Sequence, residues 1–281
     1  MRVVVVGAGG RTGRLIVEQL VARGHKAVAT IRNPKHMAAM VSLGAETVML
    51  DLELSTGPDF QAQFKGADAI VFAAGSASGE SSALDRTGLM KTARAAATAG
   101  VKRYLTISSI GAATGMKLTG EWATDEMRDY YKQKRAGNKY LQESDLDWII
   151  VEPGGLTDGK PTGKVTLSEE QIEESHIDRA DVAAVIVALL ESKKSNKRAF
   201  QLVGGKTPIA EAVAKVLGEE VAKAEVKALA KKVEAKKVAP AKKVEARKAA
   251  STKKAAPPTK AVAKKVPVKK APAKKAPAKK R

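Results

Sequence analysis

The sequence of 281 residues contains no cysteine. This absence excludes disulfide bonds and thiolate chemistry, and it is typical of proteins in a reducing cytoplasm. The three histidines, His25, His36 and His176, are scattered along the chain, so no metal site is predicted. No stretch approaches the roughly 20 apolar residues of a membrane span, and the apolar run at the N-terminus is too short for a signal peptide. We therefore expect a soluble cytoplasmic protein.

Charge is unevenly distributed along the chain. Residues 219–281 carry 22 Lys or Arg against 5 Asp or Glu, whereas residues 1–218 carry 28 against 25. The segment 219–281 also has no aromatic residue and no leucine after Leu229. Such a segment cannot bury a core that would offset the entropy lost on ordering. The composition therefore predicts a globular domain at 1–218 and a low-complexity basic tail at 219–281 that is mostly disordered.

Within residues 1–218, strand patterns alternate with helix patterns. Short apolar runs predict strands at 3–6, 26–31, 47–50, 69–73, 103–107, 148–151 and 200–203. Helices are predicted near 11–23, 34–44, 60–64, 84–99, 121–143 and 178–192, with a last helix opened by Pro208. This alternation implies right-handed βαβ units. The predicted fold class is α/β, a Rossmann-type doubly wound parallel sheet, followed by the disordered tail.

A glycine-rich turn joins the first predicted strand to the first predicted helix, in the sequence MRVVVVGAGGRTG. Such a turn presents backbone N–H groups and the positive end of a helix dipole to an anion, and its glycines let a phosphate approach closely. The spacing is G-x-x-G-x-x-G, and Thr12 occupies the place of the third glycine of G-x-G-x-x-G. The alternative is a turn that binds no ligand. The predicted cofactor contacts are Gly7, Gly9, Gly10, Arg11, Thr12 and Gly13.

No acidic residue follows the second predicted strand, where NAD sites commonly place Asp or Glu against the ribose 2′-hydroxyl. Arg32 stands there instead, and a guanidinium can make paired contacts with a 2′-phosphate. This pattern favours NADP over NAD, with a merely solvated Arg32 as the alternative. Further contacts are predicted at the adenine edge and on the nicotinamide side, from Asp51, Leu52, Ala73, Ala74 and Gly75.

Eight motifs follow one another along residues 1–217: GAGGRTG, TIRNP, LDL, FAAG, ISSIGA, Tyr130-x-x-x-Lys134, LDWIIVEPGGLTD and DRADVAAVIVALLE. Together they resemble the atypical short-chain dehydrogenase/reductase superfamily. The resemblance is to its single-domain NAD(P)H-binding proteins, related to NmrA-like sensors and to flavin and biliverdin reductases. One departure is Glu152, since that family commonly has Arg before the Pro-Gly pair. The resemblance implies cofactor contacts by Pro153, Gly154 and Leu156.

The resemblance also implies a catalytic group of Ser109, Tyr130 and Lys134. Tyr130 and Lys134 are spaced i, i+4 and share one helix face, where an ammonium favours the phenolate. In the family, the Tyr moves a proton at the substrate oxygen, the Lys also holds the ribose of the cofactor, and the Ser hydrogen-bonds the same oxygen. Ser108 is the alternative to Ser109, and the YYKQKR stretch also fits an ordinary polar helix face. We therefore predict an NAD(P)-dependent oxidoreductase, with a non-catalytic NADP(H) sensor as the alternative.

The sequence predicts the substrate only as a small carbonyl, quinone or flavin-like molecule. We expect it to bind between residues 75–87, 111–119 and 153–177. The sequence leaves the oligomeric state open, and a dimer is compatible with it.

The Lys doublets of the tail resemble the C-terminal domains of linker histones. Flexible, regularly spaced cations neutralise nucleic-acid phosphates without sequence preference. The tail is therefore predicted to bind nucleic acid or another polyanion, which would allow association with a nucleoid. A solubilising tail without a partner is the alternative, and an anionic membrane is less favoured because bulky apolar anchors are missing.

Overall fold

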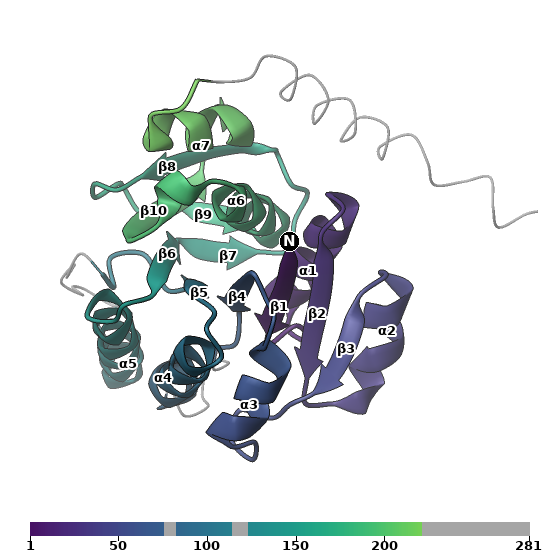
Figure 1. The fold of residues 1–281 in the computed structure, drawn as a ribbon. Coiled ribbons are helices and arrows are strands. Elements are labelled where there is room, and N and C mark those ends of the chain that lie inside the picture. The colour runs from purple at the N-terminus through teal and green to yellow at the C-terminus, as the bar shows by residue number, and fades with distance from the viewer. Residues whose placement is uncertain (76–82, 114–122, 221–281) are drawn as a thin grey trace, which may run out of the picture. The chain divides into compact units, whose positions relative to one another are not determined.

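The computed structural model describes residues 1–75, 83–113 and 123–220 (Figure 1). Most of the loops predicted at 75–83 and 111–119, and the tail beyond residue 220, lie outside the described residues.

A mostly parallel sheet forms the centre of the described chain. Its strand order is β11-β8-β10-β6-β5-β4-β1-β2-β3. The parallel members are β1 (Arg2–Val6), β2 (Lys26–Ile31), β3 (Glu46–Met49), β4 (Ala69–Phe72), β5 (Arg103–Ile107), β6 (Asp147–Pro153) and β10 (Arg198–Gly204). The predicted Rossmann-like α/β fold is confirmed.

Four short strands were not predicted from the sequence. β8 (Lys164–Ser168) runs antiparallel to β10, and β11 (Thr207–Pro208) runs antiparallel to β8. β7 (Gly155–Thr157) and β9 (His176–Asp178) pair in a separate two-stranded sheet. These strands are short and only partly buried. Their sequences therefore lack the continuous apolar run that marks a strand buried on both faces.

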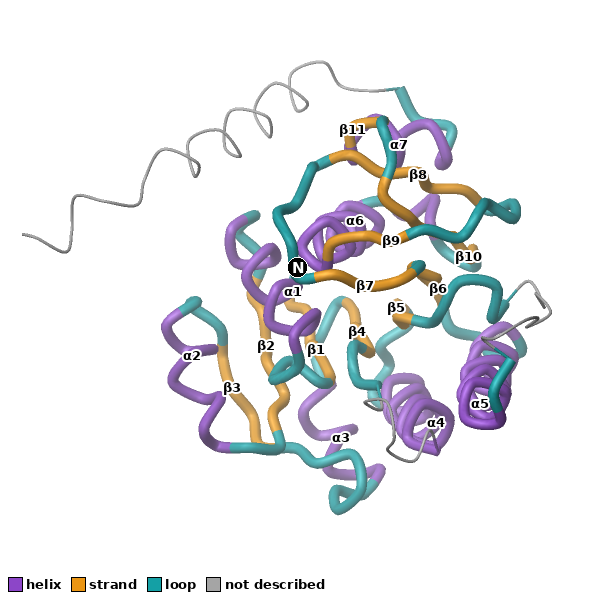
Figure 2. Tube along the Cα trace, turned by 180° about the vertical axis from the view of Figure 1, so that it is seen from behind, coloured by secondary structure: helices purple, strands orange, loops and turns teal. Residues whose placement is uncertain are grey.

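Helices cover both faces of the sheet. On one face lie α1 (Arg11–Ala22), α2 (Met37–Ser42) and α6 (Arg179–Glu191), with α7 (Ile209–Leu217) beside α6. On the other face lie α3 (Gly57–Phe64), α4 (Ala83–Thr98) and α5 (Asp125–Gln142) (Figure 1). Figure 2 shows α1 and α6 from behind, on the face opposite to α4 and α5. Two 3-10 turns, η1 (Pro34–His36) and η3 (Lys193–Ser195), complete the described elements.

The first strand shows why this sequence forms a sheet buried on both sides. Val3 and Val5 pack with α1 and α6, whereas Val4 and Val6 pack with α3, α4 and α5. All four valines are at most 1% exposed. Full burial of a valine stabilises the fold by about 1.5–3 kcal/mol, so an apolar residue is favoured at every position of this strand.

The carboxyl ends of the parallel strands meet along one edge of the sheet. There the strand order reverses between β1 and β4, which is where ligands bind in open α/β sheets. Among the described residues, none of the helices combines the length and the apolar character needed to cross a bilayer.

Candidate active site

The glycine loop after β1 is held in a tight conformation. Gly7 has φ +82°, and a Cβ there would lie 2.7 Å from the Cα of Ala74, so a side chain is excluded both by conformation and by space. The amide of Gly10 donates to the carbonyl of Gly7 at 3.0 Å, and that of Ala8 donates to the carbonyl of Thr30 in β2 at 3.1 Å. The loop is thereby closed on itself and tied to β2.

The N-terminus of α1 directly follows this loop. Its N-cap is Gly10, no side chain of the described residues caps it, and its first turn carries no acid. The amides of the first turn and the positive end of the dipole are therefore left for an anionic ligand. A dinucleotide fits this donor set, because its pyrophosphate needs backbone N–H groups without a competing carboxylate.

Three further residues of the motif, Arg11, Thr12 and Gly13, lie in the first turn of α1. A Cβ at Gly13 would collide with the carbonyl oxygen of Gly7, so this glycine allows α1 to pack closely on the strand. Arg11 is exposed and forms an ion pair with Asp158 at 2.6 Å, and Asp158 also pairs with Arg179 at 2.9 Å.

The ends of β2 and β3 lie beside the glycine loop. Arg32 is exposed, and its guanidinium has no hydrogen-bond or ion-pair partner in the described part of the chain. The carboxylate of Asp51 accepts from the amides of Glu53 and Leu54 at 2.7 and 3.2 Å, so it closes its own turn. Leu52 packs toward Gly88 of α4.

Residues 73–75 connect the glycine loop to the middle of the crevice. Ala73 donates its amide to Val6 at 2.9 Å, and Ala74 lies against Gly7. A Cβ at Gly75 would lie 3.4 Å from Oδ1 of Asp85 and 3.9 Å from Nζ of Lys134. The backbone after β4 therefore passes from the loop to Lys134.

Lys134 is buried and charged. Its Nζ lies 2.8 Å from Oδ1 of Asp85 and donates to the carbonyl of Ile107 at 3.1 Å. It also lies 5.6 Å from the centre of the Tyr130 ring. Burial disfavours the ammonium, but Coulomb attraction to the Tyr130 oxygen and to the Asp85 carboxylate, with the hydrogen bond to Asp85, more than offsets it and raises the pKa of Lys134 above its ordinary value.

Ser109 hydrogen-bonds to Tyr131 and not to Tyr130. Its hydroxyl donates to the Tyr131 oxygen at 3.3 Å, and the Tyr131 hydroxyl donates to the carbonyl of Ile110 at 3.0 Å. Tyr131 is buried, and burial is the main cause that raises its pKa. Tyr130 is half-buried, and no described residue hydrogen-bonds its hydroxyl. Tyr130 is thus the tyrosine whose oxygen is left for a ligand.

Behind Ser109 lies a second set of polar groups. The Asn138 amide donates to Oγ of Ser108 at 2.9 Å and to Oε1 of Glu152 at 3.3 Å, and the amide of Ala113 also donates to Oε1. Glu152 is fully buried, its Oε2 has no partner among the described residues, and burial raises its pKa to about 7. With the Lys134–Asp85 pair, these residues form what we call the buried polar cluster: Asp85, Ser108, Lys134, Asn138 and Glu152, each at most 7% exposed.

The end of β6 is covered by the segment that leads into β9. The Pro153 carbonyl accepts from Ile110 at 3.0 Å, and Gly154 donates to Leu202 at 2.9 Å. A Cβ at Gly154 would collide with the carbonyl of Ser175, so this segment crosses directly over it. Leu156 lies in β7, paired with Ile177 of β9.

Several of these residues were not singled out from the sequence. Asp85 acquires its place only through pairing with a helix far along the chain, so no local signal marks it. Tyr131 and Asn138 follow from the helix phase, because they share the inward face of α5 with Lys134. Glu152 was noted from the sequence only as a departure from the family pattern, although a carboxylate within the apolar run WIIVEP is itself a signal, because a buried carboxylate needs polar partners.

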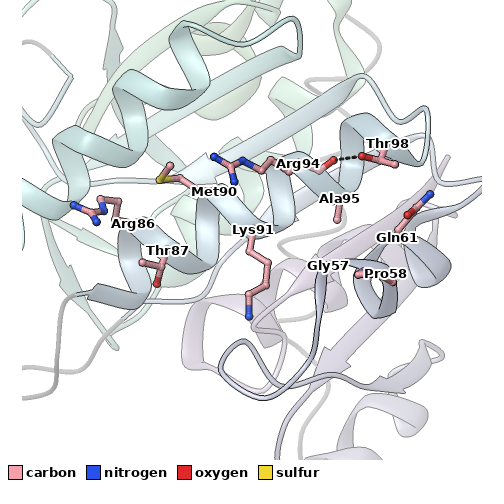
Figure 3. Close-up of a pocket in the computed structure, with 10 residues that line it drawn as sticks. All are labelled: Gly57, Pro58, Gln61, Arg86, Thr87, Met90, Lys91, Arg94, Ala95 and Thr98. Atoms are coloured by element: carbon pink, nitrogen blue, oxygen red, sulfur yellow. Dashed lines mark hydrogen bonds between the residues drawn. The ribbon is translucent and has the colours of Figure 1, made fainter.

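A separate cavity of about 530 Å³ opens between α3 and α4 (Figure 3). Its wall includes Lys91, whose ammonium donates to the carbonyls of Leu52 and Ser55 at 2.7 and 2.9 Å. None of the predicted site residues lines it. The predicted site therefore lies at the edge of the sheet and not in this cavity.

Comparison with known proteins agrees with the geometry of the glycine loop. Residues 7–193 match the model of a family described as NAD(P)H-binding. A Bacillus subtilis protein named an uncharacterized sugar epimerase, YhfK, is 36% identical over 223 residues, which cover 77% of this chain and 100% of that protein.

Two solved structures are similar to this chain over most of its length. An oxidoreductase of Lactococcus lactis, ylbE, has a TM-score of 0.67 and 28% identity, covering 78% of this chain and 98% of its own. ChuY, an anaerobillin reductase of Escherichia coli O157:H7, has a TM-score of 0.65 and 26% identity, covering 73% and 98%.

Proposed function

This chain belongs to the NAD(P)H-binding family, and from that premise we propose that it is an NADP(H)-dependent oxidoreductase of the short-chain dehydrogenase/reductase type. The observation that carries the proposal is the continuous contact from the glycine loop to Lys134. Ala74 lies against Gly7, and Gly75 lies against Lys134. A dinucleotide whose phosphates lie at the loop would extend along residues 73–75 to the lysine. When bound, the nicotinamide supplies or accepts the hydride.

The side chains around Lys134 are suited to handle the proton. Asp85 and the Ile107 carbonyl hold two of the three ammonium hydrogens, which leaves one for a ribose hydroxyl. The Tyr130 hydroxyl, beside this fixed positive charge, gives a proton to the substrate oxygen during reduction and takes it back during oxidation. Ser109, at the end of β5, would turn from Tyr131 to hydrogen-bond the same oxygen.

The substrate class remains a small carbonyl, quinone or flavin-like molecule. The likeness to an oxidoreductase and to an anaerobillin reductase supports a reductase, whereas the likeness to a protein named a sugar epimerase supports a carbonyl intermediate. Both kinds of reaction need a proton carrier next to the nicotinamide. The proposal therefore rests on Tyr130 for either one.

The test of turnover is NADPH oxidation with quinones, flavins and small carbonyls. Tyr130→Phe removes the hydroxyl and should lower kcat by roughly 100-fold or more, the usual contribution of a general acid, while the Kd for NADPH stays the same. Tyr140→Phe is the matched control, because its hydroxyl accepts from Arg94 on the outer side of α4 and α5. Unchanged turnover in Tyr130→Phe would show that another group moves the proton.

One observation favours a second candidate, a cofactor-binding redox sensor without turnover. The Ser109 hydroxyl is bonded to the buried Tyr131 and not directed to Tyr130. A protein that binds NADPH tightly but oxidises it with none of these acceptors would fit the sensor. Tyr130→Phe would then have no effect on the oligomeric or conformational response to NADPH.

We further propose that the cofactor is NADP(H), with Arg32 at the 2′-phosphate. Its exposed guanidinium, without a partner in the described chain, is free to pair with a phosphate. Titration should show tighter binding of NADPH than of NADH, and Arg32→Ala should remove most of the difference. Equal affinities in the wild type would contradict this preference.

For the tail, we propose non-specific binding of nucleic acid or another polyanion, and through it association with a nucleoid. The support is its composition, 22 Lys or Arg against 5 Asp or Glu over residues 219–281. DNA affinity of the full chain should fall steeply with salt and be lost on truncation. The truncation is best made after residue 220, because Glu219 accepts a hydrogen bond from Ser192 of the domain. Binding retained by the truncated chain would contradict the proposal.

A further inference from the structure

The side chain of His36 lies against the glycine loop. A Cβ built at Gly9 would collide with Nδ1 of the His36 imidazole and lie 3.2 Å from its Cε1. His36 is exposed to solvent, so burial does not drive it there. The imidazole therefore forms one wall of the space between the loop and the end of β2.

A rigid turn holds His36 in this place. The Asn33 side chain accepts from the amide of Lys35 at 3.0 Å and caps η1, and the amide of His36 donates to the Asn33 carbonyl at 3.1 Å. Pro34 occupies the first position of the turn, where its fixed φ favours helical geometry. The amide of Ala8 donates to the carbonyl of Thr30 in β2, so the glycine loop is hydrogen-bonded to the strand that leads into this turn.

The two segments that border this space contain no acidic residue. The segment from Arg32 to His36 reads RNPKH, with two fixed cations and no acid. The first turn of α1, on the opposite side, has no acid either. In dinucleotide-binding sheets, the pyrophosphate lies at the helix N-terminus and the adenosine ribose lies at the end of the second strand. The imidazole lies against Gly9 of the loop, and its turn follows the end of β2.

We propose that His36 is a specificity-determining residue that binds the 2′-phosphate of NADP(H) together with Arg32. An imidazole can donate an N–H to a phosphate oxygen, and Arg32 can grip the same phosphate with two parallel donors. The inference rests on the proposed NADP(H) preference and deepens it, because it assigns a second residue to the subsite. His36 then contacts the 2′-phosphate from the side of the glycine loop, and Arg32 contacts it from the end of β2.

The experiment uses nucleotide fragments, so that it does not depend on turnover. The full chain is titrated with 2′,5′-ADP and with 3′,5′-ADP, which carry the same charge and differ only in the placement of one phosphate. The basic tail attracts both isomers alike, so the ratio of their Kd values reports the subsite alone. His36→Ala should weaken 2′,5′-ADP roughly tenfold, as expected for one lost hydrogen bond to a charged group, and leave 3′,5′-ADP unchanged.

His25→Ala is the matched control. His25 lies at the other end of α1, within 3.0 Å of Glu191, and its removal should leave the ratio unchanged. His36→Asn keeps an N–H donor on a shorter side chain and should retain part of the preference.

Two outcomes would overturn the inference. If the ratio of the Kd values for 2′,5′-ADP and 3′,5′-ADP is the same in His36→Ala as in the wild type, His36 does not bind the 2′-phosphate. If it tightens both isomers, the imidazole obstructs the adenosine site instead of binding in it. A wild type that binds both isomers equally would instead refute the NADP(H) preference itself, which separates the two failures.

Discussion

The glycine loop after β1 and the buried polar cluster around Lys134 lie at the same edge of the sheet, but they offer a ligand different kinds of groups. The loop offers backbone amides from one short segment, and its geometry is fixed by Gly7 and Gly13. The cluster offers side chains that α4, β5, α5 and β6 bring together, including a buried ion pair and the buried carboxyl of Glu152. A backbone site is stable without its ligand, whereas buried charges depend on one another.

Because the buried charges depend on one another, a substitution in the buried polar cluster should lower the free energy of unfolding most. Asp85→Asn leaves the Lys134 ammonium buried without an anion, and loss of one partner of a buried pair costs about 3–5 kcal/mol in the free energy of unfolding. Urea denaturation at neutral pH measures this loss. Asp125→Asn is the control, since Asp125 also lies in a first helical turn but is exposed, and it should change stability by less than about 0.5 kcal/mol. A loss below about 1 kcal/mol in Asp85→Asn would mean that the cluster tolerates an unpaired charge.

The second carboxylate of the cluster predicts a pH dependence of stability. Burial raises the pKa of Glu152 from 4.5 to about 7, so the folded state binds its proton more tightly than the unfolded state does. Stability should therefore fall as pH rises from about 4.5 to about 7, by roughly 3 kcal/mol over the whole window. Glu152→Gln keeps an oxygen to accept from Ala113 and should flatten this fall, so that the variant gains on the wild type at pH 8.

Denaturation at several pH values checks this prediction. Glu143→Gln, at the exposed end of α5, should leave the pH profile as it is in the wild type. A Glu152→Gln profile parallel to that of the wild type would mean that this carboxyl is ionised in both states.

The same difference explains what the sequence could predict. The phosphate loop and the order of strands and helices follow from local patterns, because glycines, apolar runs and caps act within a few residues. The pairing of Asp85 with Lys134, and the bond of Ser109 to Tyr131 in place of Tyr130, depend on how α5 packs on β5 and α4. Helix spacing places Tyr130 and Lys134 on one face, but it does not determine which tyrosine reaches the serine.

Gly13 in the first turn of α1 and Gly9 in the glycine loop offer a contrast within the backbone site. A Cβ at Gly13 meets the carbonyl of Gly7 and the Cα of Ala8, which are backbone atoms that cannot move aside. Gly13→Ala should therefore lower the free energy of unfolding by about 1–3 kcal/mol, as overpacking does. The three atoms nearest to a Cβ at Gly9 all belong to the exposed His36 side chain, so Gly9→Ala should cost less than about 1 kcal/mol. Thermal or urea unfolding of both variants tests this order, and equal losses would contradict it.

The smallest effect is expected at the ion pair that joins the glycine loop to the segment after β7. Arg11 and Asp158 are 71% and 53% exposed, so Arg11→Gln should change stability by less than about 1 kcal/mol. Because Asp158 already balances its charge, Arg11→Gln should also weaken NADPH binding by no more than about twofold at physiological salt, where exposed charges are screened. Arg32→Gln, which removes a guanidinium without a partner in the described chain, should weaken it about tenfold. A tenfold loss of NADPH affinity in Arg11→Gln would mean that the Arg11 side chain leaves Asp158 and binds the cofactor phosphates. The phosphate site would then include a side chain as well as the backbone amides of the glycine loop.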